Sequence, residues 1–297
     1  MSKIEEALKK AKESRGSNIT VLRPDNDIES RSSNVRDLVT SHTDDAHSAV
    51  KRVSSAKEIA LMEEGKILEG KSLSELKIIF SEMTDHKVAN TYRDLRTKLI
   101  QKSQGKNFIA MVTSCTPGRE NSSVALNLAT AFSFDESKTS LLIDCDLNNP
   151  KLDKLLNLET DKGLTDYLEN EDIDINSILH KTGIKRLRML PAGTSRETAT
   201  EYFTSLRMRE LMSSLLTRYS DRYIFIDSAP IADSADTRIL VELCDFVLLV
   251  VPYGTVTKNR VKAAADAIGH DKLLGIIFND VPKVPSLRIP GFARSEA

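Results

Sequence analysis

Apolar runs alternate with stretches of helical spacing along the chain from about residue 88 onward. The strand-like runs are NFIAMVTS, TSLLIDCD, RLRMLPAG, RYIFIDSAP, DFVLLVVPYG and KLLGIIFND. Most of them are apolar at successive positions, as in strands that are covered on both faces. Strands that alternate strictly with helices are joined by right-handed crossovers. The pattern predicts an α/β fold: a doubly wound, mainly parallel sheet with helices on both faces.

The chain before this region is more polar and lacks strand-like runs. Apolar residues recur at helical spacing at the start, which predicts a short amphipathic helix over residues 1–16. Whether that helix is solvated or docks on a partner stays open. Residues 17–75 are expected to form a polar, mostly disordered linker. Residues 76–285 would then be the folded domain and residues 286–297 a tail.

Composition excludes several classes of protein. A net charge of −1 gives no general electrostatic grip on nucleic acid, and 5% aromatic residues without Trp argue against a platform for stacked bases. Three widely spaced cysteines give neither a disulfide framework nor a zinc pattern, which fits a reducing cytoplasm. No run approaches the length of a membrane span. We therefore expect a cytoplasmic protein with no nucleic-acid partner, and any membrane role would come through another protein.

The stretch VTSCTPGRENSSVALNLATAF, residues 112–132, reads as a strand, a loop and a helix. A phosphate-binding loop has this context, because its backbone N–H groups and the helix N-terminus present positive potential to phosphates. Pro117 and Gly118 would form the tight entry to the loop. Ser122 or Ser123 would cap the helix and place a hydroxyl on Mg²⁺.

Two further strands end in carboxylates. Asp144 ends LLID and Asp227 ends YIFID, and the carboxyl ends of parallel strands meet at one edge of a sheet. Together with Ser122, these residues predict a Mg²⁺ site. An aspartate at a strand end also often caps the following helix, so that alternative stays open for each of them.

The chain from about Ala89 to Lys283 resembles the kinase domain of bacterial tyrosine kinases (BY-kinases) of capsule and exopolysaccharide export. These proteins belong to the MinD/ParA-like branch of P-loop NTPases. The matching blocks run in order: TYRDLRTKL, SCTPGRENSSVALNLATAF, LLIDCDLNNPKLDKLL, GLTDYLEN, LRMLPAGT, RMRELMSSL, RYIFIDSAPIADSADTRIL, DFVLLVV and LLGIIFN. The opening MSKIEEAL also resembles the start of kinase-like proteins of exosortase-type clusters.

The resemblance implies a role for each matching residue. Ser122 matches the Mg²⁺-ligating hydroxyl, and Asp227 matches the Walker B aspartate. Asp144 and Asp146 match a second motif whose carboxylates act on the metal and on the attacking hydroxyl. Asn279 matches an asparagine that contacts adenine. A functional site would bind ATP or ADP with Mg²⁺ through these nucleotide-contacting residues: Pro117, Gly118, Arg119, Glu120, Asn121, Ser122, Ser123 and Asn279.

Partners are implied in the same way. Arg93 and Arg96 match two positions of an E-x-x-R-x-x-R motif through which family members pack into rings, which implies a homo-oligomer. An ordinary helix face is the alternative reading of these arginines. BY-kinase domains also work with a membrane-embedded polysaccharide co-polymerase, on the same chain or on a separate one. We expect the separate kind here, recruiting this chain to the inner face of the membrane.

The sequence departs from the family pattern at positions expected to act in phosphate binding, ring formation and phosphorylation. The P-loop lysine is Asn121, and the glycine before it is Glu120. The arginine that should follow the second aspartate is Asn148, and the acidic residue that opens the ring motif is Asn90. The C-terminus PSLRIPGFARSEA contains no tyrosine, whereas active members end in a tyrosine cluster.

Three functions are consistent with the sequence. The first is a degenerate family member that serves as a scaffold or regulator of exopolysaccharide assembly, with vestigial catalytic aspartates. The second is an active tyrosine kinase in which Arg119 supplies the missing charge. The third is a MinD/ParA-like positioning ATPase, but the extra lysine of such loops is absent from Ser114-Cys115-Thr116. The C-terminus also lacks the basic amphipathic helix that would bind a membrane surface.

Overall fold

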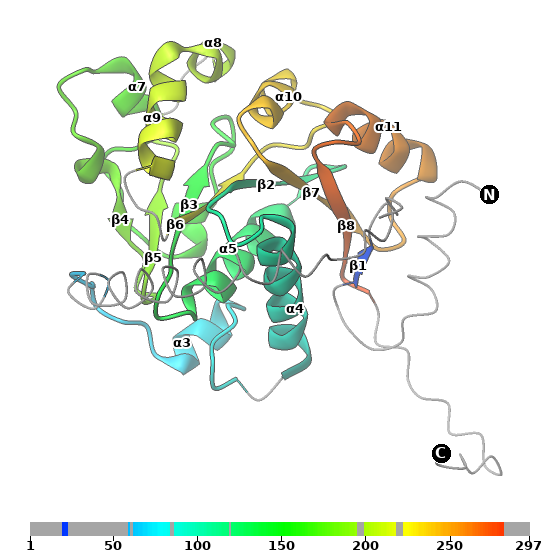
Figure 1. The fold of residues 1–297 in the computed structure, drawn as a ribbon, viewed down its shortest axis with the longest axis horizontal. Helices are drawn as coiled ribbons and strands as arrows, with labels where there is room; N and C mark the ends of the chain where they lie inside the picture. Colours follow the sequence, from blue (N-terminus) through cyan, green and yellow to red (C-terminus); the bar gives the residue numbers. More distant parts are fainter. Residues whose placement is uncertain are drawn as a thin grey trace, which may run out of the picture.

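The computed structural model describes residues 20–22, 59, 62–83, 86–118, 120–194, 199–217 and 222–281. The expected helix over residues 1–16, the tail over 286–297 and Arg119 lie outside these ranges. The strands of the described chain form one sheet of eight strands in the order β1-β8-β7-β2-β6-β3-β5-β4 (Figure 1). The strands are β1 (Thr20–Leu22), β2 (Ile109–Ser114), β3 (Thr139–Asp144), β4 (His180–Lys181), β5 (Leu187–Leu190), β6 (Arg222–Asp227), β7 (Phe246–Pro252) and β8 (Leu273–Asn279).

The interior strands pair in parallel, and only the two edge strands, β1 and β4, run antiparallel to their neighbours. Every residue of β2, β3, β5 and β6 is buried. This burial explains why their sequences are apolar at successive positions rather than alternate ones. The predicted doubly wound, mainly parallel sheet is confirmed.

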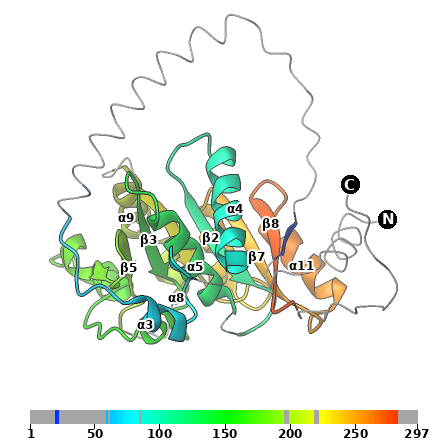
Figure 2. The same cartoon turned by 90° about the horizontal axis from the view of Figure 1, so that it is seen from below.

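Helices cover both faces of this sheet (Figures 1 and 2). One face carries α3 (Gly70–Glu75), α4 (His86–Lys102), α5 (Glu120–Ser133) and α6 (Leu152–Leu155). The other side of the sheet carries α7 (Leu164–Glu169), η1 (Ile175–Ile178), α8 (Ala199–Thr204), α9 (Leu206–Thr217), α10 (Ala235–Glu242) and α11 (Lys258–Ile268). None of the described helices is long and apolar enough to cross a bilayer.

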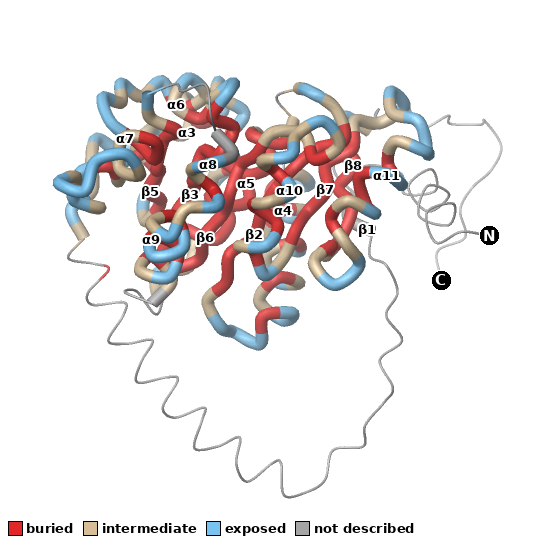
Figure 3. Tube along the Cα trace, turned by 90° about the horizontal axis from the view of Figure 1, so that it is seen from above, coloured by how far each residue is buried: buried red, intermediate tan, exposed pale blue. Residues whose placement is uncertain are grey.

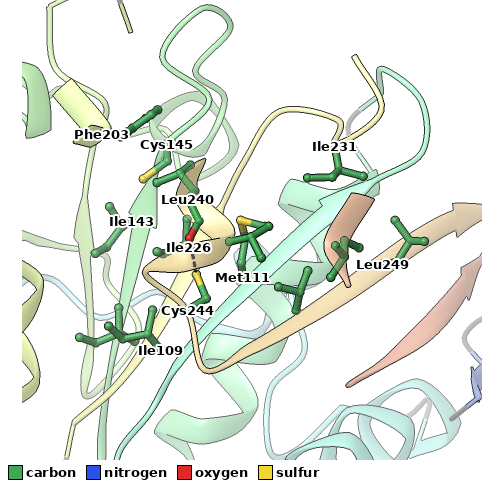
Figure 4. Close-up of a cluster of buried hydrophobic side chains, with 14 of the residues drawn as sticks. Ile109, Met111, Ile143, Cys145, Phe203, Ile226, Ile231, Leu240, Cys244 and Leu249 are labelled. Carbon is green, nitrogen blue, oxygen red and sulfur yellow. Dashed lines mark hydrogen bonds between the residues drawn. The ribbon is translucent and has the colours of Figure 1, made fainter. Parts of the chain in front are cut away.

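The two faces have separate hydrophobic cores, which follow the period of two along each strand. In β2, Ile109 and Met111 belong to the core under α9–α11, whereas Ala110 and Val112 belong to the core under α4 and α5. Figure 3 shows buried chain, including the strands and α5, through the middle of the molecule, with exposed positions on the outer helices and loops. Figure 4 shows part of the first core, where Cys244 donates to the carbonyl of Leu240 at 3.1 Å. The buried cysteine acts here as a small apolar residue.

Part of the range that was expected to be a disordered linker is folded onto the domain. The strand β1, inside that range, pairs with β8. Residues 62–69, which we call the strap, lie along β4 and β5: the N–H of Leu68 donates to the carbonyl of Gly183 at 2.8 Å. Leu73 of α3 is buried. Packed structure therefore begins before residue 76, because short backbone pairing and charged contacts hold these segments without a long apolar run.

Candidate nucleotide site at the carboxyl edge of the sheet

The sheet register brings the predicted site residues together. Asp144 at the end of β3 lies beside Asp227 at the end of β6, and Val112 of β2 pairs with the same Asp227 from the other side. The strand β2 then runs through residues 115–118 into α5, which starts at Glu120. This strand, loop and helix are the predicted arrangement, and the first turn of α5 faces the strand-end aspartates through Asn121 and Ser122.

Asn121 occupies the position of the P-loop lysine and is tied into the protein. Its side-chain nitrogen donates to Asp227 Oδ1 at 2.8 Å and to the carbonyl of Ser228 at 2.8 Å. A carboxamide has two N–H donors, so both are used. The residue is 1% exposed. Asn121 therefore fastens the start of α5 to the end of β6 and keeps no donor for a phosphate.

Glu120 covers the loop that a phosphate would contact. A Cβ placed on Gly118 would lie only 1.7 Å from Glu120 Oε2, so the carboxylate lies directly on the glycine. Oε2 is buried and has no hydrogen-bond partner. The loop thus carries a negative group at the place where P-loops present backbone N–H groups to phosphate.

Ser122 and Asp227 bring buried oxygen atoms close together. Both residues are 0% exposed, Ser122 Oγ and Asp227 Oδ2 make no well-formed hydrogen bond, and the Ser122 hydroxyl acts to lower the pKa of Asp227. Burial, followed by repulsion from Asp144, raises the pKa of Asp227 well above its usual range. Buried polar atoms are normally paired, so these two are candidate ligand-binding atoms. They are the hydroxyl and the carboxylate that the sequence assigns to Mg²⁺.

Asp144, in contrast, accepts hydrogen bonds within the fold through both of its carboxylate oxygens. Its Oδ2 accepts from the N–H groups of Lys151 at 3.0 Å and Leu152 at 3.1 Å, and its Oδ1 accepts from the N–H of Asp146 at 3.1 Å. The carboxylate therefore holds the start of α6, as the helix-capping alternative predicts. Burial raises its pKa to about 6, against the effect of these three hydrogen bonds.

Two cations near the site were not found from the sequence. Lys151 Nζ lies 3.1 Å from Asp146 Oδ2 and neutralises that carboxylate. The sequence could have indicated this pair, because Lys151 follows Asp146 by five residues and lies at the start of a helix. Arg260 of α11 donates through Nε to the carbonyl of Cys115 at 2.8 Å and pairs with Asp233 at 2.5 Å. No local pattern indicates this contact, which joins residues 145 positions apart.

The remaining predicted residues lie elsewhere on the domain or have ordinary roles. Asn279 ends β8, and its carbonyl accepts from the N–H of Tyr253 at 2.9 Å. Pro117 is exposed and Ser123 is half-buried. Arg119 lies outside the described residues.

The two arginines of the expected ring motif contact their own domain. Arg96 donates to the carbonyl of Ala131 at 3.1 Å and pairs with Asp135 at 3.4 Å, which joins α4 to the end of α5. Arg93 donates to Asn90 Oδ1 at 3.1 Å and lies 5.8 Å from the centre of the Phe134 ring. These contacts give both arginines a structural role, and ring formation stays a prediction.

A strand, loop and helix of P-loop type at the carboxyl edge of a doubly wound sheet, with strand-end aspartates, defines a P-loop NTPase fold. No family model matches the chain. The tyrosine-protein kinase YwqD of Bacillus subtilis (strain 168) is 33% identical over 202 residues, which cover 66% of this chain and 84% of that protein. The chain belongs to the family of bacterial tyrosine kinases.

Two further comparisons agree with this assignment. The succinoglycan biosynthesis transport protein ExoP of Rhizobium meliloti (strain 1021) is 27% identical over 202 residues, which cover 64% of this chain and 25% of that protein. The crystal structure of the chimerical protein CapA2B2 superposes with a TM-score of 0.64 at 25% identity, over 78% of this chain and 100% of that one. The predicted resemblance is therefore confirmed at the level of family and fold.

Proposed function

We propose that this chain is a degenerate BY-kinase-like protein that acts as a cytoplasmic scaffold or regulator in exopolysaccharide or capsule biosynthesis. The observation that carries the proposal is the pairing of Asn121 with Asp227 and Ser228, at the position where the family has its P-loop lysine. The fold is kept, while the protein's own side chains, Glu120 and Asn121, occupy the phosphate-binding part of the site.

The free energies of the interactions that are lost and gained favour weak or absent nucleotide binding. Losing one charge-assisted hydrogen bond to phosphate costs about 1.5–3 kcal/mol. A carboxylate about 4 Å from a phosphate charge adds a repulsion of about 4 kcal/mol at an effective dielectric constant near 20. Since about 1.4 kcal/mol corresponds to a factor of ten, a micromolar site becomes millimolar or weaker. Phosphoryl transfer also loses the cation that offsets its developing charge.

The described tyrosines also support a non-catalytic role. Tyr92 and Tyr223 are buried, whereas Tyr167, Tyr202 and Tyr253 are half-buried. In the part of the chain that the structure describes, no tyrosine is exposed in the way that a phosphate acceptor needs. The tail over residues 286–297 contains none. Tyr219 lies outside the described residues, so a kinase of this form would need Tyr219, a half-buried tyrosine or a tyrosine on another protein as its acceptor.

The proposed partner is a membrane-embedded polysaccharide co-polymerase or another exopolysaccharide-assembly protein, with the chain recruited to the inner membrane face. The name of ExoP, which describes transport in succinoglycan biosynthesis, supports this setting. Deleting residues 2–16 and measuring co-purification with membranes tests the N-terminal helix as the docking element. Unchanged association with membranes would remove the helix from the proposal.

An active kinase with an unusual loop is the second candidate. The observation that favours it is the retention of Ser122 and Asp227, whose free oxygens fit a Mg²⁺ ion. Those two residues would hold the ion, which would neutralise phosphate charge. The Lys151 ammonium is engaged with Asp146 and Asn121 is neutral. Among these described groups, none is left to replace the lysine.

Calorimetric titration of ATP and ADP with Mg²⁺ decides between the two candidates. The native protein is compared with the double variant Glu120→Gly/Asn121→Lys, and Glu136→Gly/Asn176→Lys, at two exposed positions with the same change of charge, serves as control. We expect no heat of nucleotide binding from the native protein or from the control, and micromolar binding by the double variant. Micromolar binding by the native protein would contradict the proposal, and tyrosine phosphorylation would then be assayed.

A further inference from the structure

The chain that follows β6 is bonded to the end of β2. We call residues 228–234, which join β6 to α10, the β6–α10 segment. The N–H of Ile231 donates to the carbonyl of Ser114 at 3.1 Å, and the hydroxyl of Thr113 donates to the carbonyl of Ala229 at 2.8 Å. The Ile231 side chain is 0% exposed and belongs to the core under α9–α11 (Figure 4). The segment therefore has fixed contacts with the strand that leads into the loop before α5.

Two side chains from other elements add to these contacts. Asn121, in the first turn of α5, donates to the carbonyl of Ser228 at 2.8 Å. Arg260 of α11 donates through Nε to the carbonyl of Cys115 at 2.8 Å, and its Nη2 pairs with Asp233 at 2.5 Å. A guanidinium presents its N–H donors in a fixed fork, so one arginine can hold two segments at a set distance. Arg260 thus joins the β6–α10 segment to the residue that follows β2.

The far end of the segment is continuous with α10. Ser234 is the N-cap residue of α10, and its hydroxyl accepts from the N–H of Thr237 at 3.2 Å. The hydroxyl of Thr237 also donates to the carbonyl of Ala229 at 3.0 Å. The first turn of α10 is therefore bonded to the segment at two points. A movement of the segment would move this end of α10 with it.

In P-loop GTPases, loops beside the phosphate site are ordered by the γ-phosphate with its Mg²⁺ and are released when that phosphate leaves. We propose that Asn121 and Arg260 hold the β6–α10 segment in one position without nucleotide, so that α10 keeps its position as well. The bonds of these two side chains to the carbonyls of Ser228 and Cys115 carry the inference. It rests on the proposed function, because a scaffold has to keep its conformation whether or not ATP is present.

The two contacts of Arg260 differ in strength. Its pair with Asp233 joins side chains that are 40% and 45% exposed, and an exposed pair contributes little by itself. Cys115, in contrast, is 0% exposed, and a hydrogen bond in a buried environment is stronger than one in water. Loss of the whole Arg260 side chain is therefore expected to release the segment far more than loss of the Asp233 charge.

The test is hydrogen–deuterium exchange of the full-length protein without nucleotide, read at the amide of Ile231. The native protein is expected to exchange slowly there, because this N–H is bonded to Ser114. Arg260→Ala and Asn121→Ala should each speed the exchange by about ten-fold or more. The amides of β5 serve as internal reference, since a general loss of stability would speed their exchange too.

The matched control is Lys262→Ala, which removes the same charge from an exposed position of the same helix and should exchange as the native protein does. Equal exchange at Ile231 in Arg260→Ala and in this control would overturn the inference. So would fast exchange in the native protein that becomes slow only when ATP and Mg²⁺ are added. Calorimetric titration of ATP tests the proposed function separately. Binding of ATP with unchanged slow exchange at Ile231 would contradict the degenerate site and leave the inference standing.

Discussion

Charged side chains are paired in the strap along β4 and β5, whereas buried oxygens are unpaired at the loop before α5. In the strap, Glu64 accepts from the N–H of Arg186 at 2.7 Å and from Arg188 Nη1 at 2.8 Å, while Arg188 also donates to the carbonyl of Glu63. At the loop, Asp227 Oδ2 and Glu120 Oε2 are buried and unpaired. Paired charges fix a segment in place, whereas unpaired buried oxygens reduce stability. The comparison separates a segment that its own ion pairs hold in place from a loop whose buried oxygens are left unpaired.

The largest expected effect on stability comes from removing one partner of the charged pair in the strap. Glu64→Ala leaves Arg188, a residue that is 9% exposed, without its carboxylate. We expect a loss of about 3 kcal/mol in the free energy of unfolding, since removing one partner leaves a buried charge unpaired. Urea unfolding measures it, with Glu69→Ala at an exposed strap position as control. A loss no larger than that of the control would show that the strap contributes little.

The second effect concerns the link between α5 and β6. Asn121→Ala removes the donors to Asp227 Oδ1 and to the Ser228 carbonyl, both in a buried environment. A loss of about 2 kcal/mol in unfolding free energy is expected, because buried acceptors are left unsatisfied. Chemical denaturation of this variant beside Asn176→Ala measures the difference. Equal stability of the two variants would mean that water replaces the amide without cost.

A third substitution tests the comparison by removing the unpaired charge of Asp227. Asp227→Asn should raise the free energy of unfolding by about 1 kcal/mol near pH 8 in metal-free buffer, as an unsatisfied carboxylate is lost. The pKa of Asp227 is raised in the folded protein, so the folded state binds more protons than the unfolded state. The native protein therefore loses stability as pH rises above about 4, the ordinary value, toward the folded pKa.

The gain of Asp227→Asn should thus be absent near pH 3.5 and grow with pH. Denaturant unfolding of both proteins across this range measures it. A gain that is constant with pH, or a variant that is less stable at pH 8, would show that the ionised carboxylate has a partner in solution.

The smallest effect is expected at the rim of the site. Asp233→Asn removes the ion pair with Arg260, whose two side chains are 45% and 40% exposed. Exposed pairs contribute less than about 1 kcal/mol, so thermal unfolding should change little. A large loss of stability would mean that Arg260 depends on this pair to hold the carbonyl of Cys115. The prediction is checked in low and in high salt, which screens an exposed pair.

The fold was largely predictable because its signal is local. The strand runs that end at Ser114, Asp144 and Asp227 are mainly apolar at successive positions, and their strands are buried at every position. The strand β1 was not predicted, since three residues carry no period and its pairing with β8 depends on contacts more than 250 positions away. The strap was missed for a related reason, because its fixed contacts are made by charged residues.

By itself, the sequence determined the family and the alternation of strands and helices from about residue 88 onward, and it predicted that Asn121 beside Glu120 replaces a phosphate-binding lysine. It left open what these two residues do and whether Asp144 binds metal or caps a helix. Only the tertiary structure decided that Asn121 bonds to Asp227, that Glu120 lies on Gly118, and that Asp144 holds α6. The reason is physical: residue types fix which groups are charged, but hydrogen-bond partners depend on distances that the folded chain sets.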